Sequence, residues 1–129
     1  MKKIFLILLF IPMLSFSQHI GNTKEEIVKH LIGENIVPQE LYDSDWGYYL
    51  YVENDSFKTI YVFNNVEICI YFYIIPIDLE VTKVFIKNFD NNDLMFKKNT
   101  TTWWWYTKNI VIEIKLNKES NVFILKKKI

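Results

Sequence analysis

The stretch that decides the fold runs from residue 57 to residue 75 and reads FKTIYVFNNVEICIYFYII. Two runs of β-branched and aromatic residues flank the pair Asn64-Asn65. Such residues favour strands, and asparagine tolerates the positive φ of a tight hairpin turn. The stretch therefore predicts two neighbouring antiparallel strands, 57–63 and 66–75.

Residues on a strand point alternately to its two sides, so each predicted strand divides its side chains between two faces of a sheet. One face is expected to be aliphatic and to form the core. Its expected members are Leu50, Val52, Ile60, Val62, Ile68, Ile70, Phe72, Ile112 and Ile114. The alternation places Glu67, Cys69, Tyr71 and Tyr73 together on the opposite side.

Helix signals lie on both sides of this hairpin in the sequence. Thr23-Lys24-Glu25-Glu26 has the pattern of a capping box, apolar residues then recur at helical spacing, and Gly33 suits the left-handed residue that ends a helix. Asp78 suits the N-cap of a second helix over 79–89, although 81–86 also fits a strand. Residues 34–46, with Pro38, are expected to form a loop.

The remaining strand signals complete an α+β domain. Strands are expected over 48–53, 94–98, 102–106, 110–116 and 122–125. Three strands follow the first helix and three or four follow the second. The predicted fold is an antiparallel sheet of about six strands with two helices on one face, in the order helix-βββ-helix-βββ, forming a single domain over 18–129. The element order repeats at an offset of about 55 residues without residue similarity, which leaves a duplication open.

The order of a helix followed by antiparallel strands resembles that of the β-lactamase-inhibitor-type domains. This resemblance rests on element order alone, and it implies a small exported inhibitor.

The first 17 residues have the layout of a secretory signal peptide. Lys2 and Lys3 precede an apolar run over 4–14, and Ser15 and Ser17 place small residues before Gln18. The apolar stretch of about 13 residues is shorter than the ~20 that a bilayer-spanning helix needs. The sequence therefore predicts an exported protein, periplasmic or extracellular, without stable membrane insertion after cleavage; the alternative is a retained anchor.

Composition limits the possible functions of the processed chain. Residues 18–129 carry 13 lysines and 15 carboxylates, which argues against binding to nucleic acid because such proteins normally have a basic excess. Cys69 is the only cysteine, so the chain has no internal disulfide.

Residues that carry catalysis or bind metals are sparse, so we expect no enzyme and no cofactor. Cys69 has no histidine near it in sequence, and His19 and His30 are the only two histidines. Asp90-Asn91-Asn92-Asp93 lacks the glycine and the distal glutamate of a helix–loop–helix calcium site. A small hydrolase is the least favoured of the functions considered.

Aromatic residues on the side opposite the predicted helices are the candidate binding set. These are Tyr49, Tyr51, Tyr61, Tyr71, Tyr73, Trp104 and Tyr106. Tyrosine combines a large apolar body with a polar tip, and exposed aromatic patches usually contact partners. The sequence therefore predicts a binding or inhibitor-like module for a protein or peptide, or for a glycan. Two alternatives stay open: a self-assembling envelope component, and tyrosines that are only strand formers covered by loop 34–46.

We predict that the protein recovered from the exported fraction of its source cells begins at Gln18. Intact mass measurement and N-terminal sequencing check this prediction. A chain that retains Met1–Ser17 would contradict it.

Overall fold

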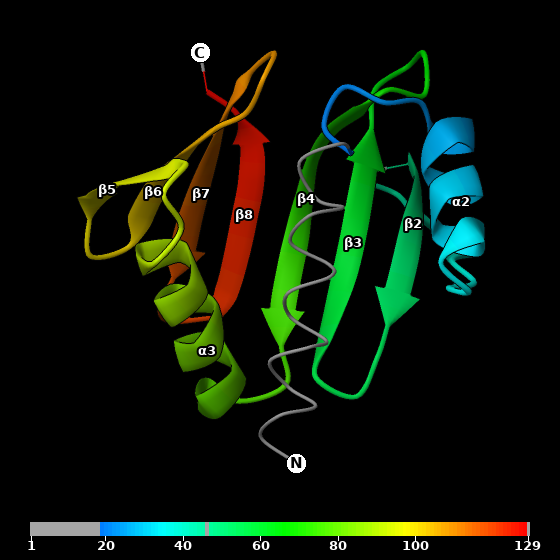
Figure 1. Cartoon of the computed structure of the whole chain (residues 1–129). Coiled ribbons are helices and arrows are strands. Elements are labelled where there is room, and N and C mark those ends of the chain that lie inside the picture. The colour runs from blue at the N-terminus through cyan, green and yellow to red at the C-terminus, as the bar shows by residue number, and fades with distance from the viewer. Residues whose placement is uncertain (1–18, 46, 129) are drawn as a thin grey trace.

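The computed structural model describes residues 19–45 and 47–128, and the predicted signal peptide lies outside this part of the chain. Its described elements form an α+β fold of two helices and an eight-stranded antiparallel open sheet (Figure 1). The elements are α2 (Lys24–Gly33), β1 (Gln39–Asp43), β2 (Gly47–Glu53), β3 (Phe57–Phe63), β4 (Cys69–Pro76), α3 (Leu79–Asp90), β5 (Met95–Asn99), β6 (Thr102–Tyr106), β7 (Val111–Asn117) and β8 (Val122–Lys127).

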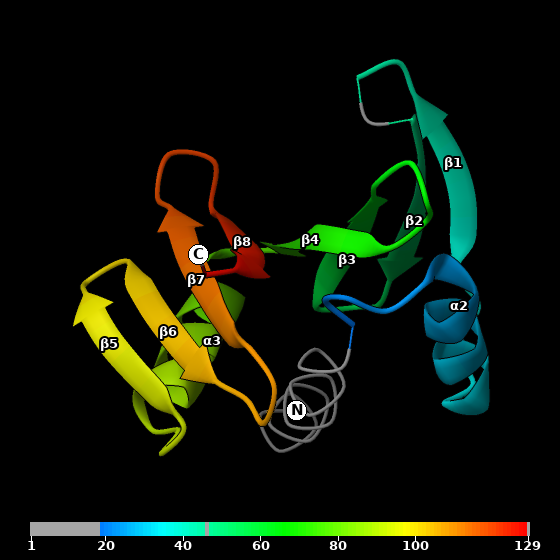
Figure 2. The same ribbon diagram turned by 90° about the horizontal axis from the view of Figure 1, so that it is seen from above.

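The sheet consists of two four-stranded meanders that are joined in the middle. The strand order is β1-β2-β3-β4-β8-β7-β6-β5, so the only pairing between the two meanders in the described chain is β4 with β8. Both described helices lie on the same side of the sheet, α2 toward the β1 end and α3 toward the β5 end (Figure 2). The predicted α+β class is confirmed, and the order is helix-ββββ-helix-ββββ.

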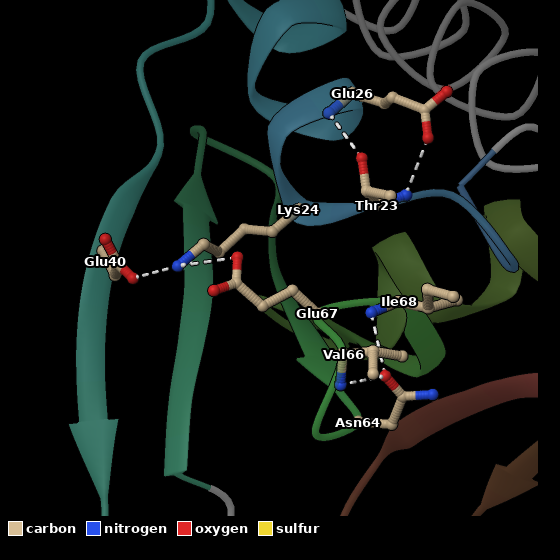
Figure 3. Close-up of polar contacts among 8 residues, drawn as sticks. All are labelled: Thr23, Lys24, Glu26, Glu40, Asn64, Val66, Glu67 and Ile68. Atoms are coloured by element: carbon tan, nitrogen blue, oxygen red, sulfur yellow. Dashed lines mark hydrogen bonds and ion pairs between the residues drawn. The ribbon is translucent and has the colours of Figure 1, made fainter.

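Side-chain caps fix the start of each helix as the sequence predicts. Thr23 Oγ1 accepts a hydrogen bond from the Glu26 amide at 3.1 Å, and the Glu26 carboxylate accepts one from the Thr23 amide at 3.0 Å (Figure 3). The Asp78 carboxylate accepts from the Val81 amide at 3.0 Å, so 79–89 belongs to a helix rather than a strand. Thr82 of α3 also donates to Asn121 at 2.7 Å, which ties the helix to the β7–β8 turn.

The helix-covered side of the sheet holds the core. One row of directly opposed residues crosses six strands with every side chain at most 2% exposed: Leu50, Tyr61, Phe72, Leu125, Ile114 and Trp103. Burial of apolar surface on this scale is the main stabilising contribution in a chain without disulfides.

Phenylalanines of α3 bind the helix to the second meander. The Phe89 ring lies 5.4 Å from the rings of both Phe123 and Trp103, and the Phe85 ring lies 5.5 Å from that of Phe123. These centroid distances suit edge-on and tilted aromatic packing, which adds to the gain from buried area. The indole of Trp103 also donates to Asp90, the last residue of α3, at 2.8 Å.

The predicted loop 34–46 is wrong in its centre, because residues 39–43 form strand β1. β1 pairs with β2 in antiparallel register and extends the sheet. Lys24 of α2 bonds Glu40 of β1 at 2.5 Å and lies 3.5 Å from Glu67, which holds this edge strand beside the helix (Figure 3). The strand QELYD has no clear apolar alternation, so no strand signal was present in its residues.

The predicted faces of β3 are inverted. Tyr61 is opposite Leu50 and Phe72 on the helix-covered side, whereas Ile60 and Val62 point to the other side with Tyr49 and Tyr51. Both rows of β3 are apolar enough for the core, so alternation alone did not distinguish them. The larger aromatic side chains bury more surface, which favours the row with Phe57 and Tyr61 under the helices.

An irregularity in the β3–β4 register explains a second error. Phe63 pairs with Cys69 but Val62 pairs with Tyr71, so the register shifts by one residue and places an extra residue in β4. Cys69 consequently joins the core while Ile70 is 40% exposed, the reverse of the prediction. The strand begins at Cys69, because residues 64–67 form a longer turn in which Glu67 has φ 61°.

The end of α2 also differs from the prediction. Gly33 is the last helical residue and has no positive φ; Asn35, two residues later, has φ 64°. Asparagine accepts this left-handed conformation, so the turn after the helix does not require glycine.

We predict that Phe123→Ala lowers the free energy of unfolding by about 3–5 kcal/mol, because the ring is fully buried among α3 and Trp103. The control Tyr42→Ala, at an exposed edge position, should change it by less than about 0.5 kcal/mol. Urea denaturation followed by tryptophan fluorescence measures both. Equal effects would contradict this location of the core.

Candidate functional site

Six of the seven candidate binding residues lie on the side of the sheet away from the helices. We call these six the aromatic face: Tyr49, Tyr51, Tyr71, Tyr73, Trp104 and Tyr106. No described helix lies on this side (Figure 2). Trp104 is three strands from Tyr71, or roughly 14 Å at the usual strand spacing, so one partner can contact both.

The tyrosines occupy two strands on either side of β3. Tyr49 is opposite Val62, which is opposite Tyr71; Tyr51 is opposite Ile60, which is opposite Tyr73. All four tyrosine side chains are half-buried. The rings of Tyr71 and Tyr73 meet edge-on at 5.5 Å. The arrangement is an apolar strip with tyrosine on each side.

Local contacts raise the pKa of two of these phenols. Tyr51 donates a hydrogen bond to Glu53, and this bond raises the pKa of the Tyr51 hydroxyl to about 12. Burial raises the pKa of Tyr73 above its usual value. The single hydroxyl proton of Tyr51 is already donated to Glu53, so this oxygen can only accept a hydrogen bond from a partner.

Trp104 forms a separate, lysine-flanked part of the aromatic face. The Nζ atoms of Lys128 and Lys98 lie 4.4 Å and 5.1 Å from its ring centroid, and the Phe96 ring lies at 5.6 Å. The Trp104 Nε1–H is buried and has no acceptor among the described residues. Its neighbours Trp103 and Trp105 point into the core, so the predicted division of the three tryptophans between the faces is confirmed.

A surface depression lies beside the tyrosines. It is lined by Ile60, Tyr73, Ile75, Asn117, Ser120, Val122 and Ile124. Tyr73 belongs to both the depression and the aromatic face, so the two are continuous. The lining is mostly apolar with two polar groups at the β7–β8 turn, as in a small recognition pocket.

Tyr61 was wrongly included in the candidate binding set. It is 2% exposed on the helix-covered side, and its ring lies 5.0 Å from His19 and 5.3 Å from Phe72. Burial raises the pKa of its hydroxyl far above the usual value. Tyr61 is therefore a core residue that no partner on the aromatic face can contact.

The structure also brings together histidines that the sequence keeps apart. The His19 ring lies 5.4 Å from that of His30, and His30 approaches Glu34 at 3.6 Å. Nothing in the sequence placed His19 beside His30, because the contact depends on how the residues before α2 cross the sheet. Burial, and then the charge of His30, lower the pKa of His19 to about 3, so His19 is neutral at physiological pH.

The groups best suited to catalysis are constrained by their surroundings. Burial raises the pKa of the Cys69 thiol to about 12, which suppresses the nucleophilic thiolate. Asp90 accepts hydrogen bonds from Trp103 and Lys97, so its carboxylate is already engaged. The described residues contain no cluster of three metal-ligating side chains. No described helix is long and apolar enough to span a membrane.

Comparison with known proteins adds no relative. The chain matches no family model, no curated protein and no solved structure.

We predict that acid weakens the fold through His19. The unfolded chain binds this proton with the ordinary pKa of 6.5, and the folded chain binds it only at about pH 3. The contribution of neutral His19 to the free energy of unfolding is therefore present above pH 6.5 and is lost as the pH falls from 6.5 toward 3. The loss between pH 7 and pH 5 is about 2 kcal/mol. Urea denaturation at several pH values measures it. His19→Phe should flatten this dependence, and parallel curves for both proteins would contradict the assignment.

Proposed function

We propose that this protein is an exported, non-catalytic binding module, inhibitor-like in character, that holds a protein or peptide partner on its aromatic face. The observation that carries the proposal is the asymmetry of the sheet. One side is covered by α2 and α3, whereas the described chain places no helix over the side with Tyr49, Tyr71 and Trp104.

The arrangement of β1 supports this proposal against the alternative that the tyrosines are only strand formers. That alternative needs residues 34–46 to fold over the aromatic face. Residues 39–43 instead pair with β2 at the edge of the sheet and extend its plane. The tyrosines are thus half-buried by their neighbours in the sheet and not covered by this segment.

The chemistry of the aromatic face suits a protein better than a glycan. Partner-binding surfaces are enriched in tyrosine and tryptophan, and their most important residues sit in a well-packed centre. Here tyrosines lie on both sides of Ile60, which is half-buried, and of Val62, which is 2% exposed, and a depression lined largely by aliphatic residues adjoins Ile60. An apolar side chain of a peptide fits such a surface, whereas a sugar needs more polar groups beside each ring.

The constrained state of Cys69 and the engagement of Asp90 support a non-catalytic role. The predicted signal peptide supports action in the periplasm or outside the cell, and the lack of a basic excess in residues 18–129 favours a partner other than nucleic acid.

The test is affinity capture from the envelope and extracellular fractions with three forms of the exported protein. These are the wild type, a face variant with Tyr49→Ala, Tyr71→Ala and Trp104→Ala, and an edge variant with Tyr42→Ala and Tyr48→Ala. The edge variant is the matched control, because both residues are exposed tyrosines on the other side of the sheet. Circular dichroism and urea denaturation first establish that all three are folded.

We predict that the wild type and the edge variant retain the same protein and that the face variant loses it. Loss of even one central aromatic residue should reduce the affinity for the partner at least ~30-fold, and the face variant lacks three. Titration of the isolated partner measures the change. Equal capture by all three forms would overturn the proposal. If no protein is captured and the wild type binds a glycan that the face variant does not bind, the partner is a glycan and not a protein.

A further inference from the structure

The open sheet has two outer strands that differ in charge. β1 and β5 are the ends of the strand order, and no described strand pairs with the outer side of either. Unpaired edges can add strands from another chain, and proteins commonly block them with charge. β1 carries Glu40 and Asp43 and no lysine, whereas β5 carries Lys97 and Lys98 and no carboxylate.

The difference in charge extends to the two halves of the domain. Residues 19–76 hold nine carboxylates and three lysines, a net charge of −6, and residues 77–128 hold six carboxylates and ten lysines, a net charge of +4. Because β4 and β8 divide the sheet between these halves, the separation along the chain is also a separation in space (Figure 1). The acidic half ends in β1 and the basic half ends in β5.

The strand directions fit the same two edges together. Every neighbouring pair in the sheet is antiparallel, so among eight strands the two outer ones run in opposite directions. When two copies stand side by side in the same orientation, β5 of one copy and β1 of the next are therefore antiparallel. The sheet continues across the junction, and the helices of both copies stay on one side.

We propose that β1 of one copy pairs with β5 of a second copy and joins the molecules head to tail. This occupant is different from the partner on the aromatic face: it pairs with the outer backbone edges of β1 and β5, although Leu41 and Phe96 point to the same side as the aromatic face. In a register that preserves the faces, Glu40 is opposite Lys97 and Leu41 is opposite Phe96. Glu40 shares the helix-covered side with Leu50, as Lys97 does with Trp103. Leu41 and Phe96 are 39% and 52% exposed and lose water on pairing.

Charge selects this pairing over the others. Two β1 strands would bring carboxylates together and two β5 strands would bring lysines together, and like charges on facing strands are destabilising. The contact joins two different patches, so successive copies can add in a row without closing. Lys97 and Lys98 thus block pairing between like edges and favour pairing with the acidic edge.

The test is directional cross-linking of the exported protein through single introduced cysteines. Leu41→Cys and Phe96→Cys variants are oxidised separately and as a mixture, and disulfide dimers are measured by non-reducing electrophoresis. Cys69 is 1% exposed, so it contributes little background. We expect dimers in the mixture at least ten times more abundant than in either variant alone. Equal yields in all three samples would overturn the proposal.

Sedimentation measures the same contact without cross-linking. The wild-type mass should exceed the monomer at about 0.02 M salt and return to it near 0.5 M, where charges are screened beyond a few ångströms. Glu40→Gln and Lys97→Gln should each weaken association, because each removes one charge of the pair across the junction. Neutral side chains avoid a lysine beside Lys24 or a carboxylate beside Asp90 within the molecule. Tyr71→Ala, on β4 in the centre of the sheet and away from both edges, should associate as the wild type does. A monomer at every salt and concentration would overturn the proposal.

Discussion

The pairing of β4 with β8 is the interaction on which the rest of the structure depends. Four opposed positions, from Tyr71 with Lys126 to Ile74 with Phe123, join two meanders that are distant in sequence. This contact makes one sheet of the two halves and buries Phe72 against Leu125. Because β4 and β8 are the central strands, β1 and β5 lie at opposite ends of the sheet, and the acidic and basic halves are separated. Without this pairing, each half is four strands and one helix with an incomplete core.

The division of aromatic residues between the two sides of this sheet connects stability with function. Phe85, Phe89, Trp103 and Phe123 pack together under α3 and supply the core. Trp104, one residue from Trp103, faces the other way between two lysines. The same residue type therefore serves the core at one position and the proposed binding surface at the next, because successive side chains on a strand point to opposite sides.

Sequence predicted the features that depend on local chemistry. Both helix starts followed from Thr23 and Asp78, whose caps are local hydrogen bonds, and the alternation of β7 from Ile112 to Leu116 is as expected. The errors arise where the tertiary structure decides. β1 exists because β2 pairs with it and Lys24 holds Glu40, neither of which QELYD reveals. Tyr61 and Ile60 were exchanged because β3 is apolar on both sides, and the shift beside Cys69 depends on the partner strand.

We conclude that one side of the sheet is open and carries tyrosines that water reaches, whereas the core row on the other side, with Tyr61, is buried. Paramagnetic broadening of tyrosine ring signals by a soluble gadolinium chelate, measured by NMR on the exported protein, tests it directly. We expect clear broadening for Tyr49, Tyr71 and Tyr106 and protection of Tyr61. Protection of Tyr49 and Tyr71 equal to that of Tyr61 would contradict it.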